Sequence, residues 1–163
     1  MIHVMTCDPP MTLVPLLTLV DSTDSPTPAR RSTRVLVVDD YVDTADVMEL
    51  FLTRAGYEVR AAYCGEDALK LASGFNPDLA IIDIRLPDMS GYELARRLRA
   101  EAGTRPLRLV ALSGRADPAE AMEARFDEIV CKPVTGSELR RLVHAHAVAA
   151  ATALAAARAA HAG

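Results

Sequence analysis

The sequence predicts an open α/β sheet of parallel strands with helices on both faces. From Arg34 onward, short apolar runs recur without alternation, which is typical of strands buried on both faces. Segments with helical spacing separate these runs, and strands alternating with helices predict a parallel sheet. Polar residues follow several of the runs directly, at the strand ends where open α/β sheets bind their ligands.

The elements follow in order from Arg34. The strand over 35–39 leads into a helix over 43–55, whose apolar positions share one face and which Gly56 ends in the left-handed conformation. Gly74 is expected to end the second helix. Further strands are predicted over 57–62, 78–83, 107–112 and 129–131, further helices over 66–73 and 92–102, and only a stub of a fourth helix over 118–124.

The last helix has a clear start signal. Thr135 and Glu138 form the pattern of a capping box, and the helix then runs into an alanine-dominated tail. The Ser/Thr/Pro-rich composition of 21–33 indicates a linker. We therefore divide the chain into a disordered N-terminal leader and linker (1–33), one folded domain (34–145) and a C-terminal helical extension (146–163).

Composition and charge exclude several classes of protein. The 163 residues are 50% hydrophobic and 25% charged, as in soluble globular proteins, and the net charge of −4 argues against nucleic-acid binding. The apolar stretch 11–20 contains Pro15 and is too short to span a bilayer. It also lacks the basic start of a signal peptide. We expect a cytoplasmic protein that binds neither nucleic acid nor membrane.

Charged and hydroxyl side chains follow four of the predicted strands. Asp39 and Asp40 end the first strand, Asp83 the third, Ser113 the fourth and Lys132 the fifth. We call the edge of the sheet formed by these five residues the rim. Carboxylates gathered there suit a hard cation such as Mg²⁺, which also takes phosphate oxygens. A lysine supplies a compact positive charge for an anion held beside the metal.

Four stretches in this order resemble the landmarks of bacterial response-regulator receiver domains: VLVVDD, IIDIRLPDMSGYEL, ALSG and VCKPV. The resemblance covers roughly 34–143. It implies a doubly wound, flavodoxin-like (βα)5 fold with strand order 2-1-3-4-5. In this chain the fourth helix would be shortened and the C-terminal helix extended.

The resemblance also implies roles for the rim residues. Asp83 resembles the phosphoacceptor, Ser113 the residue whose hydroxyl turns toward the phosphoryl group, and Lys132 the lysine that pairs with that group. The bond before Pro133 would be cis. Independently of the family, a carboxylate such as Asp83 can attack phosphorus to give an acyl phosphate, with nearby positive charge neutralising the transferring group.

The Mg²⁺ ligands are likewise implied by the resemblance. Asp39 and Asp40 resemble the acidic pair that holds the metal together with Asp83. The backbone carbonyl of Arg85 would be a further ligand. The two adjacent aspartates at the end of a buried strand are thereby interpreted as a metal site.

Several positions depart from the family pattern. Ile129 stands at the switch position, where receivers usually carry an aromatic residue, and Arg125 stands where they usually have glycine. Arg85 and Arg115 occupy the two positions that flank the path of the hydrolytic water and are expected to modulate phosphate lifetime. Asp88 is interpreted as an ordinary loop residue.

The expected function is that of a stand-alone receiver. A histidine kinase or histidine phosphotransfer protein would phosphorylate it, and it would signal to an unknown protein partner or serve as a phosphate relay or sink. It would not be an enzyme beyond self-catalysed phosphoryl transfer and autodephosphorylation. Two alternatives stay open: a degenerate receiver that acts as a phosphorylation-independent scaffold, and a phosphohydrolase of the haloacid-dehalogenase type, whose DxDx[TV] motif DDYVD does not supply.

Overall fold

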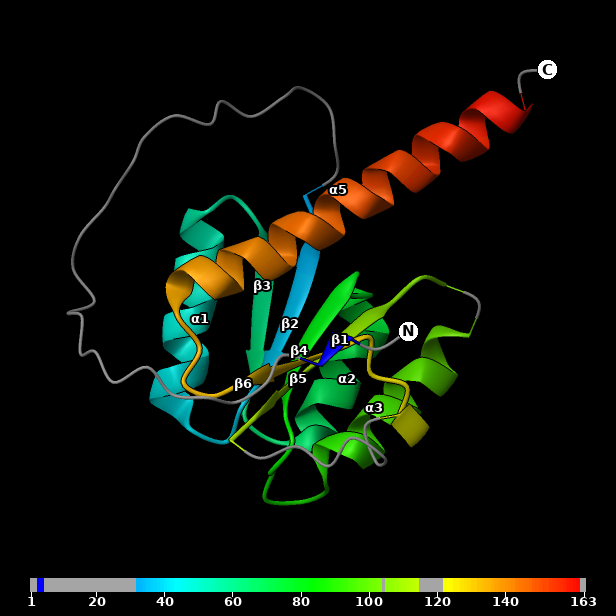
Figure 1. Ribbon diagram of the computed structural model, residues 1–163. Helices are drawn as coiled ribbons and strands as arrows, with labels where there is room; N and C mark the ends of the chain where they lie inside the picture. Colours follow the sequence, from blue (N-terminus) through cyan, green and yellow to red (C-terminus); the bar gives the residue numbers. More distant parts are fainter. Residues whose placement is uncertain (1–2, 5–31, 104, 115–121, 162–163) are drawn as a thin grey trace.

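The predicted α/β architecture is present in a computed structural model of the chain, which describes residues 3–4, 32–103, 105–114 and 122–161 (Figure 1). The strands after the leader are β2 (Arg34–Val38), β3 (Glu58–Ala62), β4 (Leu79–Asp83), β5 (Arg108–Ser113) and β6 (Glu128–Cys131). The helices are α1 (Val42–Arg54), α2 (Gly65–Phe75), α3 (Gly91–Ala102) and α5 (Gly136–His161). Each lies within two residues of its predicted bounds, including α5, whose helical extension was predicted over 146–163.

The strand order confirms the predicted topology. The sheet runs β1-β6-β5-β4-β2-β3 with every pair parallel, so the five strands after the leader follow the order 2-1-3-4-5. The sixth strand, β1 (His3–Val4), was not predicted: it lies in the leader expected to be disordered and pairs with Glu128 and Ile129 of β6. This pairing covers backbone groups that β6 would otherwise leave unpaired as an edge strand. The division of the chain into leader, domain and extension stays a prediction.

Helices cover both faces of the sheet, which explains the unbroken apolar runs (Figure 1). Alternate side chains of β2, β4 and β5 pack under α2 and α3, and the others pack under α1 and α5. Every residue of the central strand β4 is buried. Since each fully buried Leu or Ile side chain contributes about 1.5–3 kcal/mol, this two-sided burial holds the strand ends in fixed positions.

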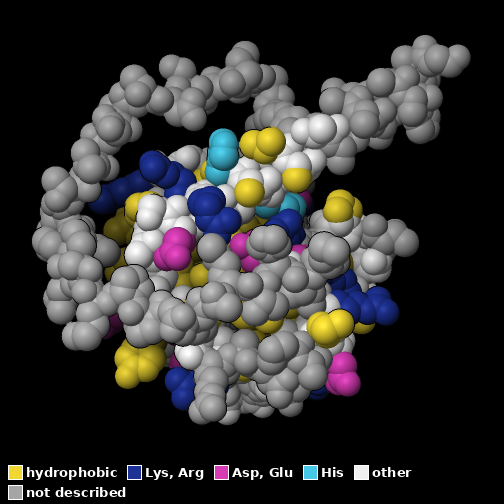
Figure 2. Space-filling model, viewed as in Figure 1, with side chains coloured by type: hydrophobic (Ala, Val, Ile, Leu, Met, Phe, Trp, Pro, Cys, Tyr) yellow, Lys and Arg dark blue, Asp and Glu magenta, His cyan; other side chains and the backbone are white. Residues whose placement is uncertain are grey.

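The capping box of α5 is confirmed. The Thr135 amide donates to Glu138 Oε2 at 2.9 Å, and the Glu138 amide donates to Thr135 Oγ1 at 3.2 Å. The helix continues to His161 and projects beyond the sheet (Figure 1). Histidine and hydrophobic side chains lie on its outer surface (Figure 2). Among the described helices, α5 included, none combines the length and hydropathy that a membrane span needs.

Two non-glycine residues in the described part of the chain have positive φ. Asn76, at φ 52°, ends α2, so the predicted stop at Gly74 is wrong; Asn tolerates the left-handed conformation through its short polar side chain.

Arg125, at φ 58°, occupies the position where receivers usually have glycine. The Arg99 guanidinium donates to the Arg125 carbonyl at 2.8 Å and to Asp127 Oδ2 at 2.8 Å. The first of these contacts ties the Arg125 carbonyl to α3.

The predicted stub of a fourth helix falls largely outside the described residues. Of its residues, 122–124 are described: Met122 and Glu123 are helical, and Ala124 lies in a turn.

Candidate functional site

The carboxyl ends of the parallel strands bring the predicted site residues together at one rim. Carboxylate oxygens of Asp39, Asp40 and Asp83 all lie within 4.8 Å of one another. Asp39 is fully buried, Asp83 is 7% exposed and Asp40 is exposed. The three carboxylates predicted from separate strand ends therefore form one cluster.

The Lys132 ammonium joins two of these carboxylates. Its Nζ donates to Asp39 Oδ2 at 2.7 Å and to Asp83 Oδ2 at 2.6 Å. Burial tends to lower the Lys132 pKa, but the hydrogen bonds to the two aspartates outweigh it and raise the pKa above its ordinary 10.5. The ammonium is thus charged at neutral pH, and the stability it contributes is lost only as pH rises through the raised folded value.

The other carboxylate oxygen of Asp39 and of Asp83 accepts a hydrogen bond from a backbone amide two residues further along the chain. Asp39 Oδ1 accepts from the Tyr41 amide at 3.0 Å, and Asp83 Oδ1 accepts from the Arg85 amide at 3.1 Å. Each carboxylate is therefore fixed on both sides while keeping further lone pairs for a ligand.

Ser113 lies beside Lys132 at the ends of β5 and β6. Its carbonyl accepts from the Lys132 amide at 2.9 Å, and its side chain is almost fully buried. The Lys132–Pro133 bond is cis, as the resemblance implies. Ser113 and Lys132 therefore lie next to each other at the carboxyl ends of neighbouring strands.

The donor set of the rim fits Mg²⁺. Two oxygens on one Mg²⁺ ion are at most about 4.2 Å apart, because each lies about 2.1 Å from the metal. The three carboxylate oxygens, within 4.8 Å of one another, need only small shifts to share one ion. Asp39, Asp40 and Asp83 are the residues that would hold it, with the Arg85 carbonyl next to them in the chain.

A glycine sets the base of the β4–α3 loop (84–90). A Cβ atom on Gly91 would lie 2.3 Å from the Asp83 carbonyl oxygen, so only glycine allows this approach. The Gly91 amide donates to the Ile84 carbonyl at 2.8 Å, and Arg85 pairs with Ser90 as an isolated bridge. The loop therefore leaves and rejoins the fold beside Asp83.

Asp88 was missed as a functional candidate. Its carboxylate accepts from the amides of Gly65 and Glu66, at 2.9 and 2.8 Å, at the start of α2. The sequence separation of more than twenty residues left no local signal for this contact. Of the remaining predicted positions, Ile129 is buried in β6 and Arg115 lies outside the described residues.

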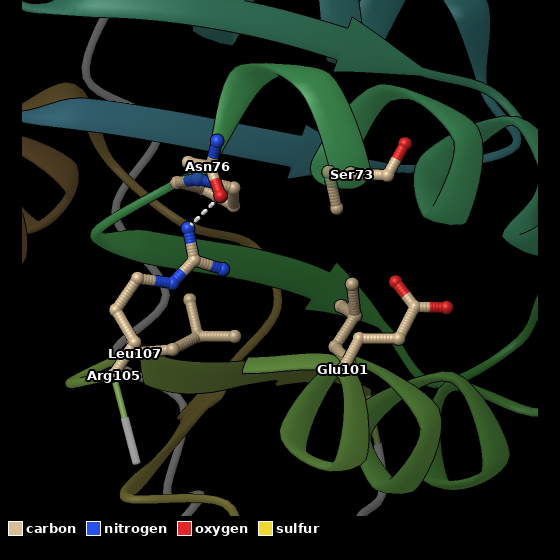
Figure 3. A pocket seen from close by; sticks show the side chains of 8 residues that line it. Ser73, Asn76, Glu101, Arg105 and Leu107 are labelled. Carbon is tan, nitrogen blue, oxygen red and sulfur yellow. Dashed lines mark hydrogen bonds between the residues drawn. The ribbon is translucent and has the colours of Figure 1, made fainter. Parts of the chain in front are cut away.

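Two cavities differ in their relation to the rim. One of about 490 Å³ opens beside the β4–α3 loop, where Arg85, Ser90 and Arg96 line it. The other, of about 300 Å³, lies between the C-terminal ends of α2 and α3, where Arg105 is hydrogen-bonded to Asn76 (Figure 3). The second cavity lies at the opposite end of the strands, and no rim residue lines it.

The sequence is similar to parts of two regulatory proteins. The chain is 40% identical over 110 residues to an uncharacterized transcriptional regulatory protein, YrkP, of Bacillus subtilis (strain 168), covering 68% of this chain and 47% of that protein. It is 35% identical over 106 residues to a probable transcriptional regulator, ycf27, of Cyanophora paradoxa, covering 65% and 44%. The chain thus spans less than half the length of these curated relatives.

Solved structures and a family model agree on the fold and the family. A putative response regulator from Chloroflexus aurantiacus J-10-fl is 34% identical with a TM-score of 0.64, over 71% of this chain and 98% of that one. The chemotaxis protein CheY4 of Vibrio cholerae is 26% identical with a TM-score of 0.66, over 70% and 98%. The model of the response regulator receiver domain matches residues 35–144. The chain belongs to the receiver-domain family of two-component response regulators.

Proposed function

We propose that this receiver accepts a phosphoryl group on Asp83 and that Mg²⁺ is its cofactor. The observation that carries the proposal is the Lys132 ammonium bridging Asp39 and Asp83, with Asp40 beside them. This arrangement places positive charge against the carboxylate that would react. Mg²⁺, when bound, would neutralise charge on the transferring phosphoryl group.

The transfer step assigns a role to each rim residue. A carboxylate oxygen of Asp83 forms a bond to phosphorus as the N–P bond of a phosphohistidine breaks, and the electron pair leaves with the imidazole nitrogen. Lys132 then pairs with a phosphoryl oxygen, and the Ser113 hydroxyl donates to another. The chain supplies positioning and charge for its own phosphorylation and loss of phosphate, and we propose no separate enzyme activity.

The donor and the output partner are proteins in this proposal. A histidine kinase or histidine phosphotransfer protein would deliver the phosphoryl group in the cytoplasm. Tyr41 is 73% exposed and Val42 is 49% exposed, directly after the acidic pair. Large side chains exposed directly after the acidic pair support docking of a partner at the rim itself.

The first prediction tests the phosphoacceptor. Asp83→Asn keeps the size of the side chain but cannot form an acyl phosphate, so it should abolish Mg²⁺-dependent labelling by a small phosphodonor. The exposed Asp43→Asn serves as the matched control and should label like the wild type. Acid-stable, alkali-labile label of undiminished amount on Asp83→Asn would refute the assignment. A wild type that takes no label would favour the scaffold alternative.

The second prediction concerns phosphate lifetime. Arg85 and Arg115 remain protonated and cannot act as bases toward the hydrolytic water, while either can pair with phosphoryl oxygens. The loss of a charge-assisted contact of about 1.4 kcal/mol changes a rate about tenfold. We therefore expect Arg85→Asn, Arg115→Ala protein to lose phosphate about tenfold faster than the wild type, with Arg54→Asn as control. A longer lifetime in the double variant would contradict this role.

The third prediction concerns the output face. Ile129 is β-branched and stiff at its first torsion, and it carries no ring that could turn between core and solvent. A ligand shifts an equilibrium only through its different affinities for the two states. With beryllofluoride and Mg²⁺, we expect amide exchange to slow at 85–90 and 113–114 and to change little across 129–143. Strong protection across 129–143 would show that the usual switch operates without its aromatic residue.

A further inference from the structure

Helix α2 receives its N-terminal cap from a distant loop. The first amides of a helix have no partner within the helix and need acceptors. Cys64, at the N-cap position, makes no side-chain capping hydrogen bond. Asp88 takes its place: Oδ1 accepts from the Gly65 amide at 2.9 Å and Oδ2 accepts from the Glu66 amide at 2.8 Å. Both carboxylate oxygens of one loop residue are thus committed to α2.

A second contact holds the same part of the loop against α2. A Cβ atom on Gly65 would lie 2.5 Å from the sulfur of Met89, so glycine makes room for the methionine side chain. Asp88 and Met89 therefore dock side by side on the first turn of α2. The loop is fixed at its base by Gly91 and at its tip by these two residues.

The charge on Asp88 suits this contact. Burial would raise the Asp88 pKa, but the hydrogen bonds from the amides of Gly65 and Glu66 outweigh it and lower the pKa overall. The carboxylate is therefore ionised at neutral pH and lies at the positive end of the α2 dipole.

The β4–α3 loop between these anchors begins beside the reacting carboxylate. The Arg85 amide is hydrogen-bonded to Asp83 Oδ1, and Arg85 pairs with Ser90 across the loop. The direction of the Arg85 carbonyl depends on the path of the loop. Among the contacts that set this path, the Asp88 cap joins the loop to α2 by two hydrogen bonds, and Asp88→Ala would remove both.

We propose that Asp88 is a positioning residue for the cation site, which sets the Arg85 carbonyl as a metal ligand by tying the β4–α3 loop to α2. This inference rests on the proposed Mg²⁺ binding. Coupling between two sites is reciprocal. Metal binding at the rim therefore also tightens the cap, and the Gly65 and Glu66 amides become better protected when Mg²⁺ is bound.

The test compares three variants with the wild type in the full chain. Asp88→Ala removes both acceptors, Asp88→Asn retains one, and Asp67→Ala removes a neighbouring carboxylate of α2 that pairs with Lys70. Mg²⁺ affinity is measured by calorimetry, and amide exchange is measured with and without Mg²⁺. Loss of a group that orients a metal ligand typically weakens affinity about 10–100-fold.

We expect Mg²⁺ to bind about tenfold more weakly to Asp88→Ala, at an intermediate level to Asp88→Asn and normally to Asp67→Ala. In the wild type, Mg²⁺ should slow exchange at Gly65 and Glu66, and this effect should be absent in Asp88→Ala. Should Asp88→Ala fail to fold, Asp88→Asn provides the same comparison.

Equal Mg²⁺ affinity in the wild type and the Asp88 variants would overturn the positioning role and leave the proposed function standing. Unchanged exchange at Gly65 and Glu66 when the wild type binds Mg²⁺ would overturn it as well. Absence of Mg²⁺ binding in the wild type would overturn both the inference and the proposed function.

Discussion

The rim depends on one interaction, the contact of the Lys132 ammonium with two carboxylates from other strands. Two carboxylates about 5 Å apart repel by roughly 3 kcal/mol at an effective dielectric of about 20. Asp39 is fully buried and Asp83 nearly so, so solvent does little to relieve this repulsion. The ammonium, 2.7 and 2.6 Å from them, offsets it and links the ends of β2, β4 and β6.

Besides the Lys132 contact, the rim needs each strand end to lie at a fixed position, and the fold provides this. Alternate residues of the parallel strands are buried against helices on opposite faces. Gly91 allows α3 to begin against the Asp83 carbonyl, and the amides of Tyr41 and Arg85 hold the outer carboxylate oxygens. Contacts within the chain therefore hold the rim carboxylates in place.

The sequence was sufficient to predict the strands and the rim, because each apolar run ends in the polar residue that the rim uses. Asp39, Asp83 and Lys132 could be placed together from strand order without knowing any side-chain contact. Contacts between distant loops could not be predicted this way. Asp88 caps a helix more than twenty residues away, and β1 pairs with β6 across more than a hundred residues of sequence; no local pattern carries either contact. Asn76 ended α2 in place of Gly74 because either residue tolerates positive φ.

The most direct test of the Lys132 contact is the free energy of unfolding of the wild type and of Lys132→Met, measured by denaturant titration in EDTA and in saturating Mg²⁺. Removal of one partner of a buried ion pair leaves uncompensated charge and typically costs about 3–5 kcal/mol; partial exposure of Lys132 reduces our expectation to about 2 kcal/mol in EDTA. Mg²⁺ should reduce the difference, because the metal replaces the missing positive charge. Equal stability of the two proteins in EDTA, or a difference that Mg²⁺ leaves unchanged, would contradict the account.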